Sequence, residues 1–326
     1  MALSVHFYRL NFGDQTEYFQ SLLDPEIQFS TSKEIPTPAQ FEVLVYPTPD
    51  KTWIEASPNL RAVIIPWAGV PEKLREVMTA YPEITIHNLH HNNFNTAEMG
   101  LALLLAAAKR LVPLDQALRR DDWSPRYEAT QAILLRGKTC LILGYGEVGR
   151  ALAGYCHALG MRVIATRKHL SHQGVEDFVE VHPASELAGL LPKADVLMIA
   201  LPLTAETEDL IGEKELAALP AGGLLVNIGR GPIVNQYALF EALKSGRLRA
   251  AASDVWYNYP ETKEARSHTP PADVPFGELD NFVLSPHRGG MVAEVERQRA
   301  EALAELLNAA NRGEPLPNQV DLEAGY

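Results

Sequence analysis

The sequence predicts an α/β protein with parallel sheets, built as two domains. Short apolar runs alternate with polar or helical segments along the chain, and this alternation is typical of repeated βαβ units. One run is followed directly by the glycine pattern G-Y-G-E-V-G at residues 144–149, which should open a helix. The length of 326 residues exceeds what one hydrophobic core usually organises, and therefore favours two domains.

The glycine pattern indicates a nucleotide site. Residues 139–143 form an apolar run long enough for a buried strand, and residues 161–165 form the next strand. Gly144 permits a tight turn, Gly146 lets backbone amides approach a pyrophosphate, and Gly149 lets the helix lie close to the strand. The positive end of the helix then faces the negative charge of the ligand. The alternative is a βαβ unit that holds no ligand.

Charge and composition exclude some partners. The chain has 29 basic and 41 acidic residues and a net charge of −12, which disfavours nucleic acid because phosphate contacts need clustered Lys and Arg. The longest apolar segment, residues 100–108, is too short to span a membrane, and the first ten residues lack a secretory pattern. Cys140 and Cys156 fall in one βαβ unit, where we expect small buried side chains rather than a disulfide. These features fit the reducing cytoplasm.

The first part of the chain predicts a small α/β domain with a parallel sheet, with strands at residues 3–8, 41–45, 62–65 and 84–86. The turn after the third strand precedes a helix that Pro71 can start. In that turn, the backbone amides of Ala68, Gly69 and Val70 could hold a carboxylate. A plain strand-to-helix turn is the alternative.

Residues 87–95 predict a polar loop with three histidines. No acidic or cysteine side chain completes a recognisable ligand pattern nearby, so we predict no metal site. We interpret the segment as a hinge loop whose polar side chains line a cleft. A helix over residues 97–110 should follow, capped by Thr96 and interrupted at Pro113.

Three polar side chains follow strands in the second half of the chain, where strands are expected at residues 195–201, 224–228, 250–255 and 282–285. The carboxyl ends of these strands should meet at one crevice. Arg230 can grip a carboxylate through two hydrogen bonds, Asp254 can accept a hydrogen bond from an amide, and His287 can transfer a proton near neutral pH. A surface ion pair for Arg230 and a structural role for His287 are the alternatives. A final helix over residues 291–310 can complete the first domain.

These motifs resemble the D-isomer-specific 2-hydroxyacid dehydrogenases. The resemblance covers most of the chain and is specific from about residue 137 to residue 290. It rests on the glycine pattern, on Leu201-Pro202-Leu203-Thr204 with Thr207 downstream, on Asn227-Ile228-Gly229-Arg230-Gly231, on Asp254-Val255 and on Ser285-Pro286-His287.

The resemblance implies a Rossmann dinucleotide-binding domain, residues 98–290, inserted into a discontinuous flavodoxin-like α/β substrate domain, residues 1–97 and 291–326. It implies that Arg230 binds the 2-oxo acid, that His287 is the general acid and base, and that Ala68 and Gly69 amides hold the substrate carboxylate. It also implies a homodimer and a nicotinamide cofactor held at Gly144, Gly146, Glu147, Val148, Gly149, Pro202, Thr207, Ile228, Gly229, Asp254 and Gly289.

One departure from the family concerns the partner of the histidine. The family usually places a glutamate before the proline that follows the aspartate-valine pair, whereas this chain has Tyr259 before Pro260. A neutral phenol stabilises an imidazolium less than a carboxylate does. We therefore expect 2-oxo acid reduction to be slow or to require lower pH, unless Glu261 substitutes for the missing acid.

A second departure concerns the cofactor. Family members that use NAD end the second strand with an acidic residue that binds the ribose 2′-hydroxyl. Here that strand ends in Arg167 and Lys168, which favour a 2′-phosphate. We therefore expect NADP in preference to NAD.

The resemblance and the residues together predict an NAD(P)-dependent reductase. Its substrate would be a small anionic 2-oxo acid of the glyoxylate or hydroxypyruvate type, and its product the D-2-hydroxy acid. Two rival hypotheses remain at this point. One is oxidation of a small anion such as formate, suggested by the missing acid before Pro260. The other is a nucleotide-sensing regulator without turnover, against which the retained Arg230 and His287 argue.

Overall fold

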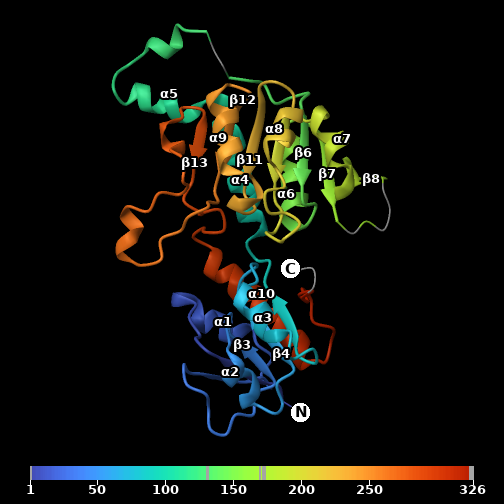
Figure 1. Cartoon of the computed structure of the whole chain (residues 1–326). Helices are drawn as coiled ribbons and strands as arrows, with labels where there is room; N and C mark the ends of the chain where they lie inside the picture. Colours follow the sequence, from blue (N-terminus) through green and yellow to red (C-terminus); the bar gives the residue numbers. More distant parts are fainter. Residues whose placement is uncertain (1, 130–131, 169, 171–173, 323–326) are drawn as a thin grey trace. The chain divides into compact units, whose positions relative to one another are not determined.

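The computed structural model describes residues 2–129, 132–168, 170 and 174–322. The chain divides into two compact units (Figure 1). The discontinuous unit comprises Met1–Asn92 and Met291–Tyr326, and the central unit comprises Asn93–Gly290. The first division falls where a long helix begins at Asn93, a few residues before the boundary expected from the sequence.

The discontinuous unit is a five-stranded parallel sheet covered by helices on both faces, with strand order β2-β1-β3-β4-β5. Its strands are β1 Ser4–Phe7, β2 Gln28–Thr31, β3 Val43–Val45, β4 Ala62–Ile65 and β5 Thr85–Asn88. Alternate residues of the buried strands point to opposite faces. One face packs against α1 (Thr16–Leu22) and α10 (Val295–Asn311), and the other against α2 (Lys51–Ala56) and α3 (Glu72–Met78). The last long helix therefore completes the first unit, as expected.

The central unit is an eight-stranded sheet with the order β13-β12-β11-β10-β6-β7-β9-β8. Only β8 runs antiparallel to its neighbour among the described strands. The strands are β6 Thr139–Leu143, β7 Arg162–Arg167, β8 Gly174–Glu176, β9 Val179–Pro183, β10 Val196–Ile199, β11 Gly223–Asn227, β12 Leu248–Ser253 and β13 Phe282–Leu284. Helices α4 (Asn93–Lys109) and α6 (Glu147–Ala158) cover one face, and α7 (Leu187–Leu190), α8 (Glu213–Ala218) and α9 (Gln236–Lys244) cover the other.

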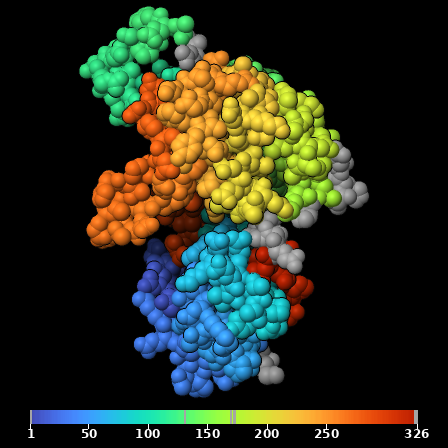
Figure 2. All heavy atoms as spheres, viewed as in Figure 1, coloured from blue at the N-terminus to red at the C-terminus, as the bar shows by residue number. Residues whose placement is uncertain are grey.

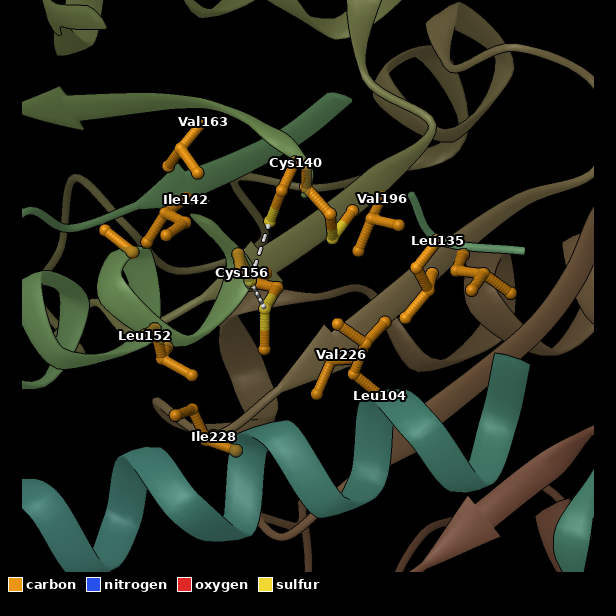
Figure 3. Packing of buried hydrophobic residues seen from close by; sticks show 14 of the residues in the cluster. Leu104, Leu135, Cys140, Ile142, Leu152, Cys156, Val163, Val196, Val226 and Ile228 are labelled. Carbon is orange, nitrogen blue, oxygen red and sulfur yellow. Dashed lines mark hydrogen bonds between the residues drawn. The ribbon is translucent and has the colours of Figure 1, made fainter. Parts of the chain in front are cut away.

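A sulfur cluster lies in the core beneath α4 and α6 (Figure 3). The two cysteine Sγ atoms are 3.7 Å apart, and Cys156 Sγ lies 3.8 Å from Met198 Sδ. Both cysteines are free and buried, which confirms the prediction of small buried side chains. The contact with Cys156 and burial raise the pKa of the Cys140 thiol, so this cluster is packing material rather than a reactive site.

Several helix and strand boundaries differ from the sequence prediction. Helix α4 begins at Asn93, so Thr96 lies inside the helix and is not its cap. The chain breaks after α4 at Arg110, which has a φ of 52°, and not at Pro113. Pro113 lies in the first turn of α5 (Leu111–Leu118), where a missing N–H costs no hydrogen bond. Strands β2, β8 and β9 were not expected.

Helix α5 and the residues after it form an arm that projects from the body of the central unit (Figure 2, green). Several of its large apolar side chains are exposed, namely Leu111, Leu114, Leu118, Trp123 and Tyr127, which are between 45% and 81% accessible. Within the described part of the chain, no helix has the length and apolar character needed to cross a bilayer.

Candidate active site

The glycine-rich turn joins β6 to α6 at the carboxyl edge of the central sheet. Gly144 has a φ of +97°, and the amides of Gly144 and Tyr145 both donate to the Thr166 carbonyl at the end of β7. A left-handed φ of this kind favours glycine because it has no Cβ. A Cβ on Gly144 would also lie 2.8 Å from the Ala200 carbonyl oxygen. The turn therefore packs closely between the ends of β7 and β10.

The other two glycines have different surroundings. A Cβ on Gly149 would lie 2.0 Å from the Gly144 carbonyl oxygen, whereas a Cβ on Gly146 would meet nothing within 4 Å. Gly149 thus allows α6 to lie against the turn, and Gly146, its N-cap, keeps open space in front of the helix amides. This arrangement fits the pyrophosphate of a dinucleotide. Glu147 is exposed and Val148 is half-buried in the first turn.

The loop after β10 is fixed by its own threonines. Thr207 Oγ1 donates to the Pro202 carbonyl at 2.8 Å and accepts from the Thr204 amide at 2.8 Å. Ile228 points into the core rather than into solvent, so only its backbone is available to a ligand. A Cβ on Gly229 would lie 2.6 Å from the Leu201 carbonyl oxygen. Glycine at this position therefore lets the backbone before Arg230 pack against the loop after β10.

The cations at the end of β7 are both exposed. Lys168 Nζ pairs with Glu206 Oε2 at 2.6 Å, and these two side chains are 40% and 69% accessible. Glu206 belongs to the loop after β10, so the ion pair joins two loops that flank β6. No local pattern indicates this pairing, because the partners are 38 positions apart (206 − 168) on different βαβ units.

Asp254 fastens the histidine-bearing loop to the end of β12. One oxygen accepts from Ser285 Oγ at 2.5 Å and from the Arg288 amide at 2.8 Å, and the other accepts from the Gly289 amide at 2.7 Å. The carboxylate is buried, with only 2% of the residue accessible. Three bonds to one carboxylate fix the loop on both sides of His287. The sequence had suggested a nicotinamide contact for Asp254 but missed this positioning role.

His287 is presented by a strained backbone. Its φ is 55°, a left-handed conformation that is uncommon outside glycine. The His287 amide donates to the Ser285 carbonyl at 3.0 Å, and Trp256 Nε1 donates to the same carbonyl at 2.7 Å. The loop therefore holds an unfavourable conformation through bonds on both sides of the histidine.

Tyr259 contacts His287 directly. Its Oη lies 2.9 Å from Nδ1 of the imidazole and accepts a bond from the Trp256 amide at 3.2 Å. Burial raises the pKa of Tyr259, so the phenol stays protonated at neutral pH. Tyr259 thus occupies the place expected for the missing acid, and the exposed Glu261 does not take over the contact with Nδ1.

Arg230 lies within electrostatic reach of this pair. Desolvation by burial lowers the pKa of His287, the positive charge of Arg230 lowers it further, and the Asp254 carboxylate opposes both. The guanidinium donates to the Gly229 carbonyl at 2.7 Å, and the Asn227 amide group donates to the Arg230 carbonyl at 2.9 Å. The charge of Arg230 therefore influences the imidazole of His287, although the two residues are 57 positions apart (287 − 230).

A cavity of about 620 Å³ borders His287 and Tyr259. Its wall is mostly apolar, with Arg266 and Asn258 among the polar side chains that line it. The residues come from the segment after β12 and from the strand end that carries His287. A small organic molecule can enter such a space.

The predicted carboxylate-binding residues belong to the discontinuous unit. Ala68 and Gly69 follow β4, and the Ala68 carbonyl accepts a bond from Asn88 Nδ2 at 2.7 Å.

The histidines of residues 87–95, predicted as a polar loop, have different surroundings. His87 lies in β5, and its Nδ1 is 2.8 Å from the Pro317 carbonyl oxygen. Burial, Arg299 and His90 lower the pKa of His91 to about 4. Within the described residues, no three His, Cys, Asp or Glu side chains gather as a metal site.

Comparison with known proteins gives consistent matches. Residues 101–289, more than half of the chain, match the family model described as D-isomer specific 2-hydroxyacid dehydrogenase, NAD binding domain. A glyoxylate reductase of Korarchaeum cryptofilum is 36% identical over 70% of this chain and 66% of its own length. A D-3-phosphoglycerate dehydrogenase of Archaeoglobus fulgidus is 31% identical over 92% of this chain and 55% of its own length. The chain thus spans about half the length of the phosphoglycerate dehydrogenases it matches.

A solved structure agrees in fold over the whole chain. The D-isomer specific 2-hydroxyacid dehydrogenase of Xanthobacter autotrophicus Py2, in complex with NADPH and MES, superimposes with a TM-score of 0.80 at 24% identity, covering 100% of both chains. The fold, the glycine-rich turn and the family match agree. The chain therefore belongs to the D-isomer specific 2-hydroxyacid dehydrogenases, and its residues 101–289 carry the NAD-binding domain of that family.

Proposed function

We propose that the protein reduces a small 2-oxo acid, of the glyoxylate or hydroxypyruvate type, to the D-2-hydroxy acid. The observation that carries this proposal is the arrangement of Arg230, His287 and Tyr259 at the carboxyl edge of the dinucleotide-binding sheet. A cation, a proton donor and a nucleotide turn at one edge are the groups that carbonyl reduction needs. Relatives named glyoxylate reductase support the substrate class.

In the proposed mechanism, each side chain has one task. Arg230 binds the substrate with two parallel hydrogen bonds and polarises its carbonyl oxygen. Tyr259 holds Nδ1 of the imidazole, so proton transfer to that oxygen falls to Nε2 of His287. A nicotinamide cofactor, with its pyrophosphate held at the glycine-rich turn, would supply the hydride from its reduced ring. In the reverse direction His287 takes the proton back as a base.

The preferred cofactor in this proposal is NADP. Arg167 ends β7 and Lys168 follows it, so no acidic residue of this strand end accepts a bond from a ribose 2′-hydroxyl. Two cations instead favour a 2′-phosphate. The solved relative from Xanthobacter autotrophicus Py2 was crystallised with NADPH, which supports the same preference.

The discontinuous unit would serve as the substrate domain, with the amides of Ala68 and Gly69 holding the substrate carboxylate. These residues follow a buried strand at the carboxyl edge of the five-stranded sheet, the usual position for ligand contacts in such sheets. We further propose a homodimer. The exposed apolar arm around α5 (Figure 2) supports it, because such surfaces in folded proteins usually pack against a partner.

The experiment is an absorbance assay for reduced nicotinamide with the purified chain. Glyoxylate, hydroxypyruvate and pyruvate are tested with NADPH and NADH, and formate and D-3-phosphoglycerate are tested with the oxidised cofactors. Turnover of a small 2-oxo acid, fastest with NADPH, is the expected result. Turnover of formate alone would replace the proposal with anion oxidation, and tight cofactor binding without turnover of any compound would indicate a sensor.

An Arg230→Lys variant serves as the control for the mechanism. Lysine keeps the charge but loses the planar pair of donors. We expect kcat/KM to fall about 100-fold while the cofactor Kd stays the same. An unchanged kcat/KM would remove Arg230 from the mechanism.

A further inference from the structure

An ion pair between Lys168 and Glu206 links the loops that follow the two neighbours of β6. Strand β6 lies between β7 and β10 in the central sheet, and all three run parallel. Lys168 follows the end of β7, and Glu206 lies in the loop after β10. Their side chains meet at 2.6 Å. The pair therefore joins the two loops on either side of the glycine-rich turn.

Glu206 is presented by a rigid loop. The Thr207 and Glu208 amides both donate to the Thr204 carbonyl at 3.0 Å, and Thr207 Oγ1 bonds to the Pro202 carbonyl and the Thr204 amide. These bonds hold the backbone on both sides of Glu206. The carboxylate of Glu206 therefore stays within reach of Lys168.

We propose that Glu206 sets the selectivity between NADP and NAD by competing with the 2′-phosphate for Lys168. This inference rests on the cofactor preference proposed above. The Glu206 carboxylate already neutralises Lys168, so a 2′-phosphate must displace it or share the ammonium with it, and either arrangement weakens the attraction of Lys168 for the phosphate. NAD carries no such group and leaves the pair intact. Glu206 therefore weakens binding of NADP and has little effect on binding of NAD.

The size of the effect follows from the exposure of the pair. Both side chains are well exposed, at 40% and 69%, and exposed ion pairs contribute modestly and are screened by salt. Breaking such a pair corresponds to an affinity change of about fivefold. The effect should shrink as the salt concentration rises.

The test measures Kd for NADPH and NADH by titration of the full chain, with tryptophan fluorescence as the readout. Glu206→Gln should lower the Kd for NADPH about fivefold and leave the Kd for NADH within twofold. Glu208→Gln is the matched control. Glu208 is an exposed acid two positions from Glu206, so its replacement removes the same charge from the same loop. It should leave both constants within twofold. In a Lys168→Gln background, the gain from Glu206→Gln should fall below twofold.

Four results would overturn the proposal: no gain for Glu206→Gln, equal gains for Glu206→Gln and Glu208→Gln, weaker binding of both cofactors, or an undiminished gain without Lys168. The cofactor preference itself is judged separately from the unmodified chain. If the unmodified chain binds NADH more tightly than NADPH, the preference for NADP is wrong, yet the change in selectivity caused by Glu206→Gln still decides the present inference.

Discussion

The phenol oxygen of Tyr259 lies 2.9 Å from Nδ1 of His287, and a phenol can serve both charge states of an imidazole. Its O–H donates a hydrogen bond to Nδ1 when that nitrogen carries no proton, and its oxygen accepts a hydrogen bond from Nδ1–H when the ring is charged. The Trp256 amide donates to the same oxygen and keeps the phenol in place in both cases. Tyr259 therefore orients the ring without favouring the imidazolium, as a carboxylate would.

This arrangement predicts the pH dependence of reduction. Desolvation and the charge of Arg230 lower the pKa of His287, and reduction needs the protonated ring. The rate of reduction should therefore decline as pH rises through a value below the ordinary histidine pKa, while oxidation should gain over the same range. A pH profile of kcat/KM in both directions is the measurement.

Tyr259→Glu should restore the acid that the family usually has. A carboxylate beside Nδ1 stabilises the imidazolium and raises the pKa of His287, so the profile for reduction moves to higher pH. At pH 8 we expect reduction to be about tenfold faster than in the unmodified chain. Tyr259→Phe is the control, since it removes Oη without adding charge. A profile that stays in place in Tyr259→Glu would show that residue 259 does not govern the protonation of His287.

The sequence predicted which candidate residues follow a strand. Gly144, Arg230 and His287 each stand after an apolar run, and in the structure they follow β6, β11 and β13 of one parallel sheet, whose carboxyl ends share one edge. Their roles in the site stay predictions. The contact between Tyr259 and His287 could be predicted only from the resemblance to the family, because the family usually has an acid at the position of Tyr259. Local pattern alone gives no reason to pair two residues 28 positions apart.

Other features depend on tertiary structure and left no signal in the chain. The polar strand β2, Gln-Phe-Ser-Thr, forms because β1 offers an open edge, and tertiary context overrides a weak local preference. Helix α4 begins before Thr96 although threonine is a good cap. The three bonds that Asp254 makes to the loop around His287 are long-range and could not be predicted from spacing.

Asp254→Asn should loosen that loop and change the protonation of His287. An asparagine amide would face the Gly289 amide, two donors in contact, in a buried site. We expect a loss of about 2 kcal/mol in the free energy of unfolding. Removing the negative charge should also lower the pKa of His287 further, because the Asp254 carboxylate raises it, so reduction declines at lower pH than in the unmodified chain.

Denaturant unfolding and a pH profile together check this prediction. The exposed Asp280 offers a matched control, since Asp280→Asn makes the same replacement and should change neither quantity. A loss of stability in Asp254→Asn with an unchanged pH profile would limit Asp254 to a structural role.

The arm around α5 predicts the effect of a charge on assembly. Leu118 is 50% exposed on α5, and a charge there is unfavourable in an apolar interface. Leu118→Glu should shift the protein from dimer to monomer in sedimentation velocity, with the free energy of folding of the monomer changed by less than about 0.5 kcal/mol. Val175→Glu is the control, because Val175 is 68% exposed on β8. An unmodified chain that sediments as a monomer would contradict the proposed dimer.

The glycines of the turn predict opposite outcomes for one substitution. Gly149→Ala places a methyl group 2.0 Å from the Gly144 carbonyl oxygen, so α6 must shift away from the turn. The free energy of unfolding should fall by about 3 kcal/mol.

In Gly146→Ala, the added methyl group meets nothing within 4 Å. As a change of helix cap, the substitution should lower the free energy of unfolding by less than about 1 kcal/mol. Its methyl group instead fills the space in front of the helix amides, so Kd for both cofactors should rise about tenfold or more. Unfolding curves and cofactor titrations separate the two variants, and a Gly146→Ala protein that binds NADPH normally would show that the pyrophosphate does not approach the helix there.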